Sequence, residues 1–429
     1  MIIGGRRASF LLFVGDVVAF GFSLYLTLWL RYGSVPDAAK LAPYLAPFSF
    51  LFALWLLVFY GSGLYGKRIA LFPSRLPDAL LRTQIANILF AALFFFLVPS
   101  FGIAPKTILL LYLIVSLVLV AVWRIGLYPR LPSRRPRERA LLLATGSEAD
   151  ELFSEVNGNP RYGIEFIAPG TDDAHMAILV TDGAIPNGFP IGGKQIVAFE
   201  DLYEEVFDRV PLSQLGRAWF TGNVPAADPF WYALAKRTID IVGGVLMGVI
   251  TIIIAPFICV ANRVEGPGPL FIKQERIGRA GVPIAVYKFR SMTQNLVASG
   301  EWMHEGENRV TRVGKFLRTT SLDEFPQFLN VLTGEISLIG PRSDISGLGR
   351  RLAESLPYYN ERYLVTPGIT GWAQINQQYE PGNVSPQSIE ETNVRLAYDF
   401  YYLKHRSLGL DIVIAVKTIK RMFFRVSSW

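Results

Sequence analysis

Two neighbouring carboxylates, Asp323 and Glu324, lie in the segment of this chain that is best suited to act on a phosphate. An aspartate is already ionised near neutral pH, so it can attack a phosphoryl group without a base to activate it. The attack brings anions together, and cations must neutralise the phosphate oxygens and the charge that develops in the transition state. The same segment supplies four cations, of which the last is the strongest candidate for a phosphate contact: Arg312, Lys315, Arg318 and Arg342.

The two acids also have an ordinary structural explanation. Ser321 followed by Glu324 is the pattern of a capping box, in which the glutamate bonds back to the serine amide at a helix start. Pro326 argues against this explanation, because proline is costly inside a helix and favourable at its first position. The sequence therefore predicts a helix that begins near Pro326 and leaves both acids just before its positive end, where phosphate also binds.

A divalent cation would complete this chemistry. Mg²⁺ prefers oxygen ligands and keeps several waters, so one or two carboxylates together with a diphosphate can hold it. Asp323 and Glu324 are the predicted Mg²⁺ ligands. The single cysteine, Cys259, lies in an apolar run, so an intramolecular disulfide is excluded, and three histidines make a zinc cluster an unattractive alternative.

Four further residues are weaker candidates. Lys288, Arg290 and Arg276 suit a diphosphate clamp, although a basic face toward anionic lipid explains them nearly as well. Asp399 lies among aromatic residues at helical spacing, where aromatic anchoring near a membrane is the simpler interpretation. Its carboxylate is either a second metal ligand or a structural group.

The elements that must position these residues begin with membrane segments. The chain has 429 residues, of which 51% are apolar and only 18% charged, and its long uncharged runs indicate a membrane protein. Four segments in the first third are long enough to span a bilayer: Phe10–Leu30, Tyr44–Tyr60, Ile85–Phe101 and Ile108–Leu127. Basic residues flank them on alternate sides, which predicts cytoplasmic loops there. No cleavage site follows the first apolar run, so we expect a retained helix.

The formal net charge of +7 requires an anionic partner. Lipid head groups, phosphorylated substrates and nucleic acid all qualify by charge. Because the basic residues cluster beside apolar segments, we predict anionic membrane lipids and phosphorylated substrates as partners, and no nucleic acid.

Composition divides the rest of the chain. Residues 1–130 are predicted to form a four-helix transmembrane bundle, residues 131–139 a linker rich in arginine and proline, and residues 140–228 a soluble α/β domain. Strands are expected at 140–144, 165–168 and 177–181, with a helix at 148–156. A dinucleotide-binding fold has G-x-G-x-x-G after its first strand, and this pattern is absent, so a structural or regulatory module is favoured over a nucleotide site.

The last predicted domain, residues 229–429, begins with an apolar run at about 239–260. Basic residues flank both of its ends, which disfavours a crossing. Pro256 removes a backbone donor and can bend a helix back to its starting face, so the sequence predicts a re-entrant hairpin, with a fifth spanning helix as the alternative. Residues 408–424 read as an amphipathic helix at the membrane interface.

These segments together resemble the monotopic phosphoglycosyl transferases, also called bacterial sugar transferases, in their large form. The resemblance covers nearly all of residues 236–424. It rests on motifs in the expected order, namely 236–240 (KRTID), 266–271 (GPGPLF), 274–278 (QERIG), 288–292 (KFRSM), 322–327 (LDEFPQ), 337–342 (SLIGPR), 367–371 (PGITG) and 398–402 (YDFYY).

The resemblance implies a membrane protein of class α and α/β, with a transmembrane bundle, a Rossmann-like module and a mainly α catalytic domain that has a re-entrant hairpin. Asp323 would be the nucleophile that takes a phospho-sugar from a UDP-sugar with release of UMP, and Glu324 its partner in metal and phosphate positioning. Undecaprenyl phosphate would then accept the phospho-sugar in a ping-pong sequence. The turn at 367–371 would place Thr370 and Trp372 in the catalytic domain, where the indole either stacks on the substrate or fills the core.

Two positions depart from the family pattern. Ala255 precedes Pro256 where the family often has serine, which removes a hydroxyl that can satisfy a backbone group freed by the bend. Ser343 follows Arg342 where the family often has a second proline, which leaves the rigidity of that loop in question.

Two other classes of protein explain the sequence less well. A processive polysaccharide synthase would release UDP and usually carries a separated aspartate pair after a nucleotide-binding strand, which this sequence lacks. A non-catalytic scaffold of a polysaccharide export complex leaves the last domain's motifs unexplained. We expect an enzyme of the bacterial inner membrane with its catalytic domain on the cytoplasmic face and a possible homodimer, while the sugar transferred stays open.

Overall fold

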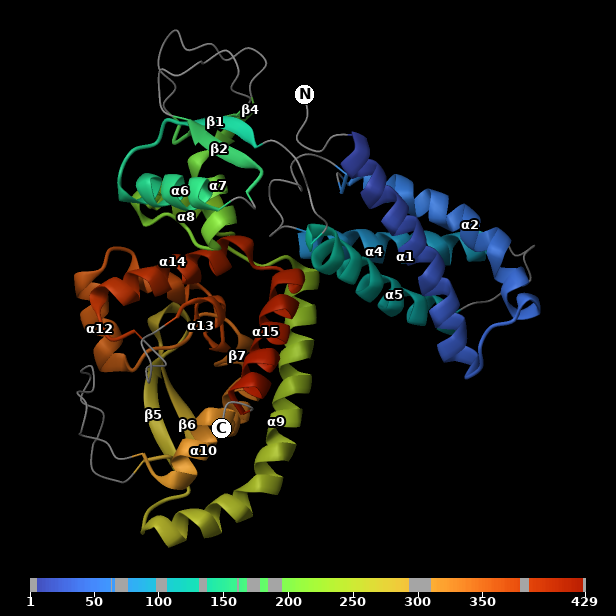
Figure 1. Cartoon of the computed structure of the whole chain (residues 1–429). Coiled ribbons are helices and arrows are strands. Elements are labelled where there is room, and N and C mark those ends of the chain that lie inside the picture. The colour runs from blue at the N-terminus through green and yellow to red at the C-terminus, as the bar shows by residue number, and fades with distance from the viewer. Residues whose placement is uncertain are drawn as a thin grey trace. The chain divides into compact units, whose positions relative to one another are not determined.

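The computed structural model describes residues 6–62, 64–65, 76–97, 106–130, 137–159, 162–167, 178–183, 195–292, 310–378 and 386–426. The chain divides into two compact units, Met1–Phe207 and Asp208–Trp429 (Figure 1).

Long apolar helices make up the first part of the first unit. They are α1 (Arg6–Tyr32), α2 (Ala38–Gly61), α4 (Leu76–Leu97) and α5 (Lys106–Ala121), and α5 continues through a π-helix, Val122–Leu127, into a short 3₁₀ turn, Tyr128–Arg130. Each is long and apolar enough to cross a membrane. The four predicted spans are therefore helical, although α2 and α4 begin several residues earlier than expected. The predicted end of the third span, Phe101, lies outside the described residues.

A buried ion pair between Asp16 and Arg124 joins the first helix of this bundle to its last helical segment. The guanidinium of Arg124 donates from Nε to Asp16 Oδ1 over 2.9 Å and from Nη1 to the Leu64 carbonyl over 2.8 Å. Tyr65 donates its hydroxyl to the same carboxylate over 2.6 Å. Charged groups are rare inside membrane bundles and are paired when they occur, so this cluster ties α1 to the π-helix that follows α5 and to the residues just after α2.

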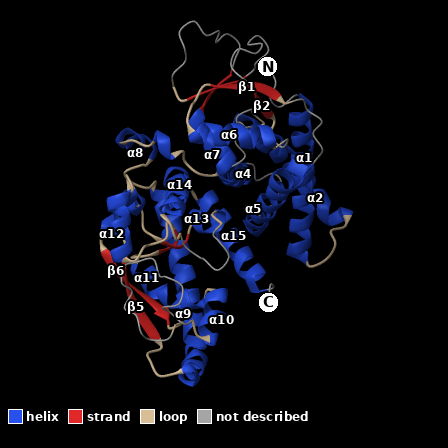
Figure 2. Cartoon of the chain, turned by 60° about the vertical axis from the view of Figure 1, so that its left-hand side comes forward, coloured by secondary structure: helices blue, strands red, loops and turns tan. Residues whose placement is uncertain are grey.

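A small parallel sheet follows in the same unit. Its strands are β1 (Glu138–Leu142), β2 (Ile164–Ile167), β3 (Ile178–Thr181) and β4 (Gln195–Ala198), in the order β2-β1-β3-β4. Figures 1 and 2 show α6 (Ser147–Gly158) and α7 (Phe199–Phe207) on one side of it. The three predicted strands and the helix are present, and β4 was not predicted. A parallel sheet with this order has the α/β character expected for the module.

The second unit begins at Asp208, about twenty residues before the predicted domain boundary at 228/229. Aromatic packing explains the difference. The short helix α8 (Arg217–Asn223) carries Trp219 and Phe220, whose rings lie 6.2 and 5.1 Å from that of Phe400. Residues 208–228 therefore belong to the core of the second unit.

Helix α9 (Phe230–Glu265) spans 36 residues and contains Pro256. Its buried positions follow one stripe along nearly its whole length: Asp240, Gly244, Gly248, Thr251, Ile258 and Asn262. The opposite face exposes large apolar side chains, among them Val242, Leu246, Val249, Ile253, Phe257 and Val264. Figure 1 shows the helix changing direction toward its C-terminal end. The stripe packs α9 on the rest of its unit, whereas the exposed face has the apolar character of a lipid-facing surface.

The remaining elements of the second unit are mainly helical, as predicted. An antiparallel hairpin, β5 (Phe271–Ile277) and β6 (Pro283–Phe289), precedes α10 (Arg312–Thr320), a 3₁₀ turn (Leu322–Gln327) and α11 (Phe328–Thr333). Strand β7 (Ser337–Ile339) pairs in parallel with β8 (Gly368–Thr370). Between and after them lie α12 (Ser346–Ser355), a 3₁₀ turn (Tyr359–Leu364), α13 (Trp372–Asn376), α14 (Ile389–His405) and α15 (Leu408–Val426).

Glycines bring α9 close to the segment that carries the two acids. A Cβ atom on Gly248 would stand 2.9 Å from the ring of Phe328, and one on Gly244 would stand 3.1 Å from Leu332. Phe328 directly follows the 3₁₀ turn that contains Asp323 and Glu324.

We predict that Gly248→Leu destabilises the second unit by about 1–3 kcal/mol, because overpacking forces α9 and α11 apart. Thermal unfolding of the detergent-solubilised protein measures the effect. Gly21→Leu in α1 is the matched control, since a Cβ there meets nothing within 4 Å. Equal shifts of the unfolding temperature for both variants would contradict the prediction.

Candidate active site

The two acids lie in the first turn of the 3₁₀ segment Leu322–Gln327. Helix α10 ends at Thr320 because Ser321 adopts a left-handed conformation, φ 58°, and closes the helix through its backbone N–H. The capping box is not formed, since the Glu324 carboxylate bonds elsewhere. The predicted helix start near Pro326 is two residues early, because α11 begins at Phe328.

The Glu324 carboxylate is held between two cations. Its Oε1 accepts from Lys288 Nζ over 2.7 Å and from Arg342 Nη2 over 2.5 Å. Lys288 comes from β6 and Arg342 from the loop after β7, so three separate elements meet at this carboxylate. Burial alone would raise the pKa of Glu324, but the charges of Arg342 and then Lys288 outweigh it and hold the pKa well below its usual range.

Asp323 has the opposite character. Among the described residues its carboxylate makes no hydrogen bond or ion pair, although the side chain is only 9% exposed. Burial raises the pKa of Asp323, and the neighbouring Glu324 charge raises it further, while Lys288 and Arg342 act against the shift. The site therefore contains one carboxylate that is fixed and one that is free to react.

Positive charge exceeds negative charge around the two acids. Arg276 reaches the site from β5, with Nη1 on the Ser343 carbonyl at 2.5 Å and Nη2 on Gln274 Oε1 at 2.8 Å. Burial and the nearby Arg342 lower the pKa of Arg276 to about 10. The positive charge of Arg318, on α10, also acts to lower the pKa of Asp323. Four cations thus surround two carboxylates, which suits a diphosphate.

The structure uses other predicted residues elsewhere. The Arg290 guanidinium donates to the carbonyls of Pro267, Asn262 and Gly266 at 2.7–3.0 Å, so it closes the end of α9. Thr370 lies 2.8 Å from the hydroxyl of Thr418. Neither side chain forms a hydrogen bond or ion pair with the two acids.

Trp372 and Asp399 have core positions. Trp372 is buried, stacks on Tyr401 with ring centroids 5.5 Å apart and donates Nε1 to the Asp208 carbonyl over 2.7 Å. This is the core-filling alternative of the sequence interpretation. Asp399 is buried and forms an ion pair with Arg362 at 2.7 Å, so its carboxylate is structural here. Pro256 lies within α9.

The motif at 236–240 has roles that its sequence did not reveal. Arg237 donates to the carbonyls of Val331 and Leu332, at the end of α11, over 2.8 and 2.6 Å. Asp240 Oδ1 accepts the backbone N–H of Leu338 over 2.9 Å. These bonds attach the start of α9 to the elements on both sides of the acid pair.

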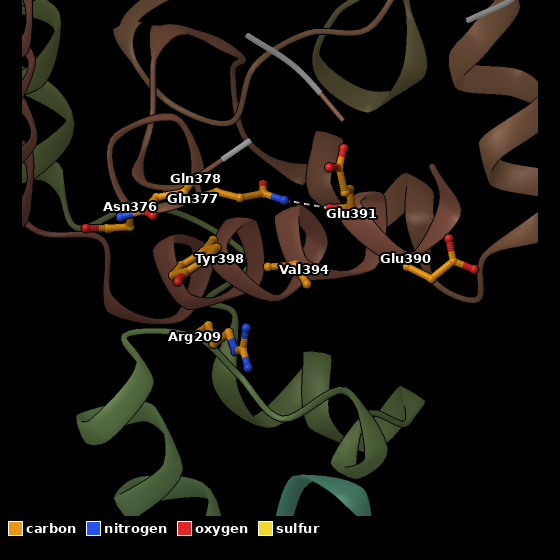
Figure 3. Close-up of a pocket in the computed structure, with 8 residues that line it drawn as sticks. All are labelled: Arg209, Asn376, Gln377, Gln378, Glu390, Glu391, Val394 and Tyr398. Atoms are coloured by element: carbon orange, nitrogen blue, oxygen red, sulfur yellow. Dashed lines mark hydrogen bonds between the residues drawn. The ribbon is translucent and has the colours of Figure 1, made fainter. Parts of the chain in front are cut away.

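A separate cavity of about 460 Å³ lies in the second unit between the end of α13 and the first half of α14 (Figure 3). Its lining is mostly polar and consists of Arg209, Asn376, Gln377, Gln378, Glu390, Glu391, Val394 and Tyr398. None of the predicted site residues lines it.

The donors around Asp323 and Glu324 suit one kind of Mg²⁺ site. Within the described ranges no three Asp, Glu, His or Cys side chains gather at one point. Two adjacent carboxylates fit a Mg²⁺ ion that takes its other ligands from water and substrate phosphates, and do not fit an ion held by protein alone.

Comparison with known proteins defines the class. Residues 231–425 match the bacterial sugar transferase family. The chain is 39% identical over 190 residues to the UDP-N-acetylgalactosamine-undecaprenyl-phosphate N-acetylgalactosaminephosphotransferase of Aeromonas hydrophila, a match that covers 44% of each protein. It is 37% identical over 203 residues to the UDP-glucose:undecaprenyl-phosphate glucose-1-phosphate transferase of Escherichia coli (strain K12), 46% of this chain and 42% of that enzyme.

A shorter relative is matched over more of its own length. The UDP-glucose:undecaprenyl-phosphate glucose-1-phosphate transferase of Caulobacter vibrioides is 35% identical over 193 residues, which cover 43% of this chain and 68% of the relative. The chain spans less than half the length of the first two relatives. With five helices apolar enough to cross a membrane among the described residues, this is a membrane-associated protein. It belongs to the bacterial sugar transferase family, as its motifs predicted.

The electrostatics of the site predict that Lys288 has a lowered pKa. Burial lowers the pKa of Lys288 to about 8, because the nearby Arg276 and Arg342 add to the effect of burial and the Glu324 charge only partly opposes it. Competitive acetylation of the protein across a pH series, read by mass spectrometry, is expected to show half-maximal labelling of Lys288 near pH 8. In Glu324→Gln the midpoint should move lower still. A midpoint near the ordinary lysine value of about 10.4 would refute the prediction.

Proposed function

We propose that this protein transfers a sugar-1-phosphate from a UDP-sugar to undecaprenyl phosphate. The observation that carries the proposal is the free Asp323 carboxylate beside a Glu324 that Lys288 and Arg342 hold in place. The names of the relatives support the same substrates, with N-acetylgalactosamine phosphate transferred by one and glucose-1-phosphate by others. The product would begin the synthesis of an exopolysaccharide, capsule, O-antigen or related glycoconjugate.

The proposed reaction has two displacements at one phosphorus atom. An oxygen of Asp323 attacks the phosphorus that bears the sugar, the bond from this phosphorus to the bridging oxygen breaks, and UMP leaves with that oxygen. An oxygen of undecaprenyl phosphate then attacks the same phosphorus, and Asp323 departs as a carboxylate. The lipid-diphosphate-sugar is released, and the enzyme returns to its starting state.

The cations of the site have separate tasks in this scheme. Arg342 and Arg276 neutralise the diphosphate, and Lys288 keeps Glu324 from turning toward the nucleophile. Asp323 and Glu324 would hold Mg²⁺ together with substrate oxygens. When bound, Mg²⁺ withdraws charge from the phosphate and so lowers the repulsion that Asp323 meets.

We also propose that α9 enters the membrane and returns to the same side. Asp240, near its start, bonds to β7. At its end, Asn262 donates to the Arg290 carbonyl just after β6, and Glu265 Oε1 accepts the Val313 N–H of α10 over 3.0 Å. Both ends of α9 therefore bond to one compact unit, which a straight crossing would divide. The catalytic unit would lie on the cytoplasmic face of the bacterial inner membrane, against anionic lipids, and the four helices of the first unit would cross it.

We expect purified protein with undecaprenyl phosphate, Mg²⁺ and a panel of UDP-sugars to release UMP with at least one donor. Asp323→Asn should reduce the rate by at least about 1,000-fold, since an amide cannot act as the nucleophile. The exposed carboxylate variant Glu354→Gln on α12 is the control and should keep full activity.

The covalent step has its own measurement. Without lipid acceptor, wild-type protein should exchange labelled UMP into the UDP-sugar, and Asp323→Asn should not. UDP as the product would indicate a glycosyl transferase, and absence of any nucleotide release would favour a scaffold. Either result refutes the proposal.

Removal of metal gives a further expected outcome. Chelation with EDTA should abolish UMP release, and added Mg²⁺ should restore it, because the two carboxylates and the diphosphate repel one another without it. Full activity in excess EDTA would show that the cations of the protein suffice and that Asp323 and Glu324 are not metal ligands.

A further inference from the structure

The backbone of the loop that carries Arg342 is held by residues other than the two acids. Arg362 Nη2 donates to the Arg342 carbonyl over 2.8 Å, and Arg276 Nη1 donates to the next carbonyl, that of Ser343, over 2.5 Å. The carbonyl of Asp344 accepts the N–H of Ile277 over 2.9 Å. Three consecutive carbonyls are thus fixed by β5 and by the 3₁₀ turn Tyr359–Leu364.

The carboxylate of Asp344 holds Arg362, one of the residues that bond to this loop, in place. Its Oδ2 accepts the hydroxyls of Tyr359 and Tyr363 over 2.6 and 2.7 Å and the guanidinium of Arg362. Its Oδ1 accepts from Arg395 Nη2, on α14, over 2.8 Å. A single carboxylate therefore gathers donors from two elements and places one of them, Arg362, on the backbone of Arg342.

Charge balance explains why the cluster can be buried. Asp344 and Asp399 face Arg362 and Arg395, and all four side chains are at most 8% exposed. Burial alone would raise the pKa of Asp344, but Arg362 and Arg395 outweigh it and keep the pKa far below its usual range. The carboxylate thus stays charged, and loss of one member would leave an unpaired buried charge.

None of these residues touches Asp323 or Glu324 through a hydrogen bond or ion pair, and the hydrogen bonds of the cluster lead to Glu324 through the backbone and side chain of Arg342. The Arg342 guanidinium at the end of this path bonds to Glu324 and, from Nη1, to the Ile369 carbonyl over 3.3 Å. A guanidinium that must meet a carboxylate and a diphosphate together needs a fixed backbone, because side-chain freedom alone would let it turn away.

We propose that Asp344 and Arg362 are positioning residues that fix Arg342 for phosphate binding. The inference rests on the proposed function for its kinetic consequence, but its structural content, a loop held rigid by one buried carboxylate, is independent of the reaction. The competing explanation is that the cluster only stabilises the fold.

A double-mutant cycle separates the two explanations. Asp344→Asn removes the charge that attracts Arg362, and kcat/KM for the UDP-sugar should fall by roughly 10- to 100-fold. In an Arg342→Ala background the same change should cost less than about 3-fold, because the group that it positions is gone. A purely structural role would give the same factor in both backgrounds, and that result overturns the proposal.

A milder variant guards against misfolding. Tyr363→Phe removes one hydrogen bond to Asp344 without a change of charge, and kcat/KM should fall by about 3- to 10-fold, while thermal unfolding should show the variant still fully folded at the assay temperature. Tyr112→Phe, which removes a buried hydroxyl that bonds to the Phe20 carbonyl in the first unit, is the matched control and should leave kcat/KM unchanged.

Hydrogen exchange tests the structural content without reference to catalysis. Peptides that cover 340–344 should exchange faster in Asp344→Asn and Tyr363→Phe than in wild type, while peptides of β1 should not change. If wild type releases no UMP, the proposed function fails and this measurement still decides the positioning role. Unchanged exchange at 340–344 overturns the positioning role even if UMP is released.

Discussion

The ion pairs of Glu324 with Lys288 and Arg342 are the interaction on which the arrangement of the site depends. They join the 3₁₀ turn that contains the acids to β6 and to the loop after β7, which are far apart in the chain. Because the carboxylate is largely buried, each of its partners would be costly to leave unpaired. The ion pairs therefore keep the three elements together. Both cations bond to Glu324, and the adjacent Asp323 has no hydrogen-bond or ion-pair partner among the described residues.

The surrounding structure serves to hold these three elements. Asp240 and Arg237 attach the start of α9 to β7 and α11, and Arg290 closes its end. On the opposite side, Asp344 gathers tyrosine and arginine side chains under the Arg342 loop. The family often has a second proline after Arg342, and here Ser343 takes that place. In this chain, side-chain hydrogen bonds and ion pairs hold the backbone that a proline ring would otherwise stiffen.

Local patterns in the sequence predicted the parts that depend on neighbouring residues. Hydropathy located the membrane helices, and the motif around Asp323 and Glu324 located the acids and their family. The start of α11 lies two residues later than predicted because Leu322–Gln327, which includes Pro326, forms a 3₁₀ turn before the α-helix begins. The second compact unit begins at Asp208, earlier in the chain than composition suggests, because rings near residue 220 pack on α14, 180 residues later.

Side-chain roles were the least predictable feature. Arg290 and Lys288 are two residues apart on one strand and its exit, yet one closes a helix and the other holds Glu324. Strand alternation would put residues two apart on the same face, but β6 ends at Phe289, so Arg290 leaves the strand and its side chain meets a different part of the fold. In the Asp344 cluster, Arg395 bonds to a carboxylate 51 residues earlier in the chain, so no spacing rule could have found the cluster.

Helix α9 is bonded near both of its ends to the unit that carries Asp323, so the position of the helix and that of the carboxylate are linked. Whatever depth the exposed apolar face takes in a bilayer also sets the height of this carboxylate above the hydrocarbon. A polyprenyl phosphate could then be met in the head-group plane, with its tail still dissolved among the acyl chains. Each methylene that stays there spares about 0.8 kcal/mol of exposure to water. The helix would thus set the distance between the reacting carboxylate and the hydrocarbon core of the membrane.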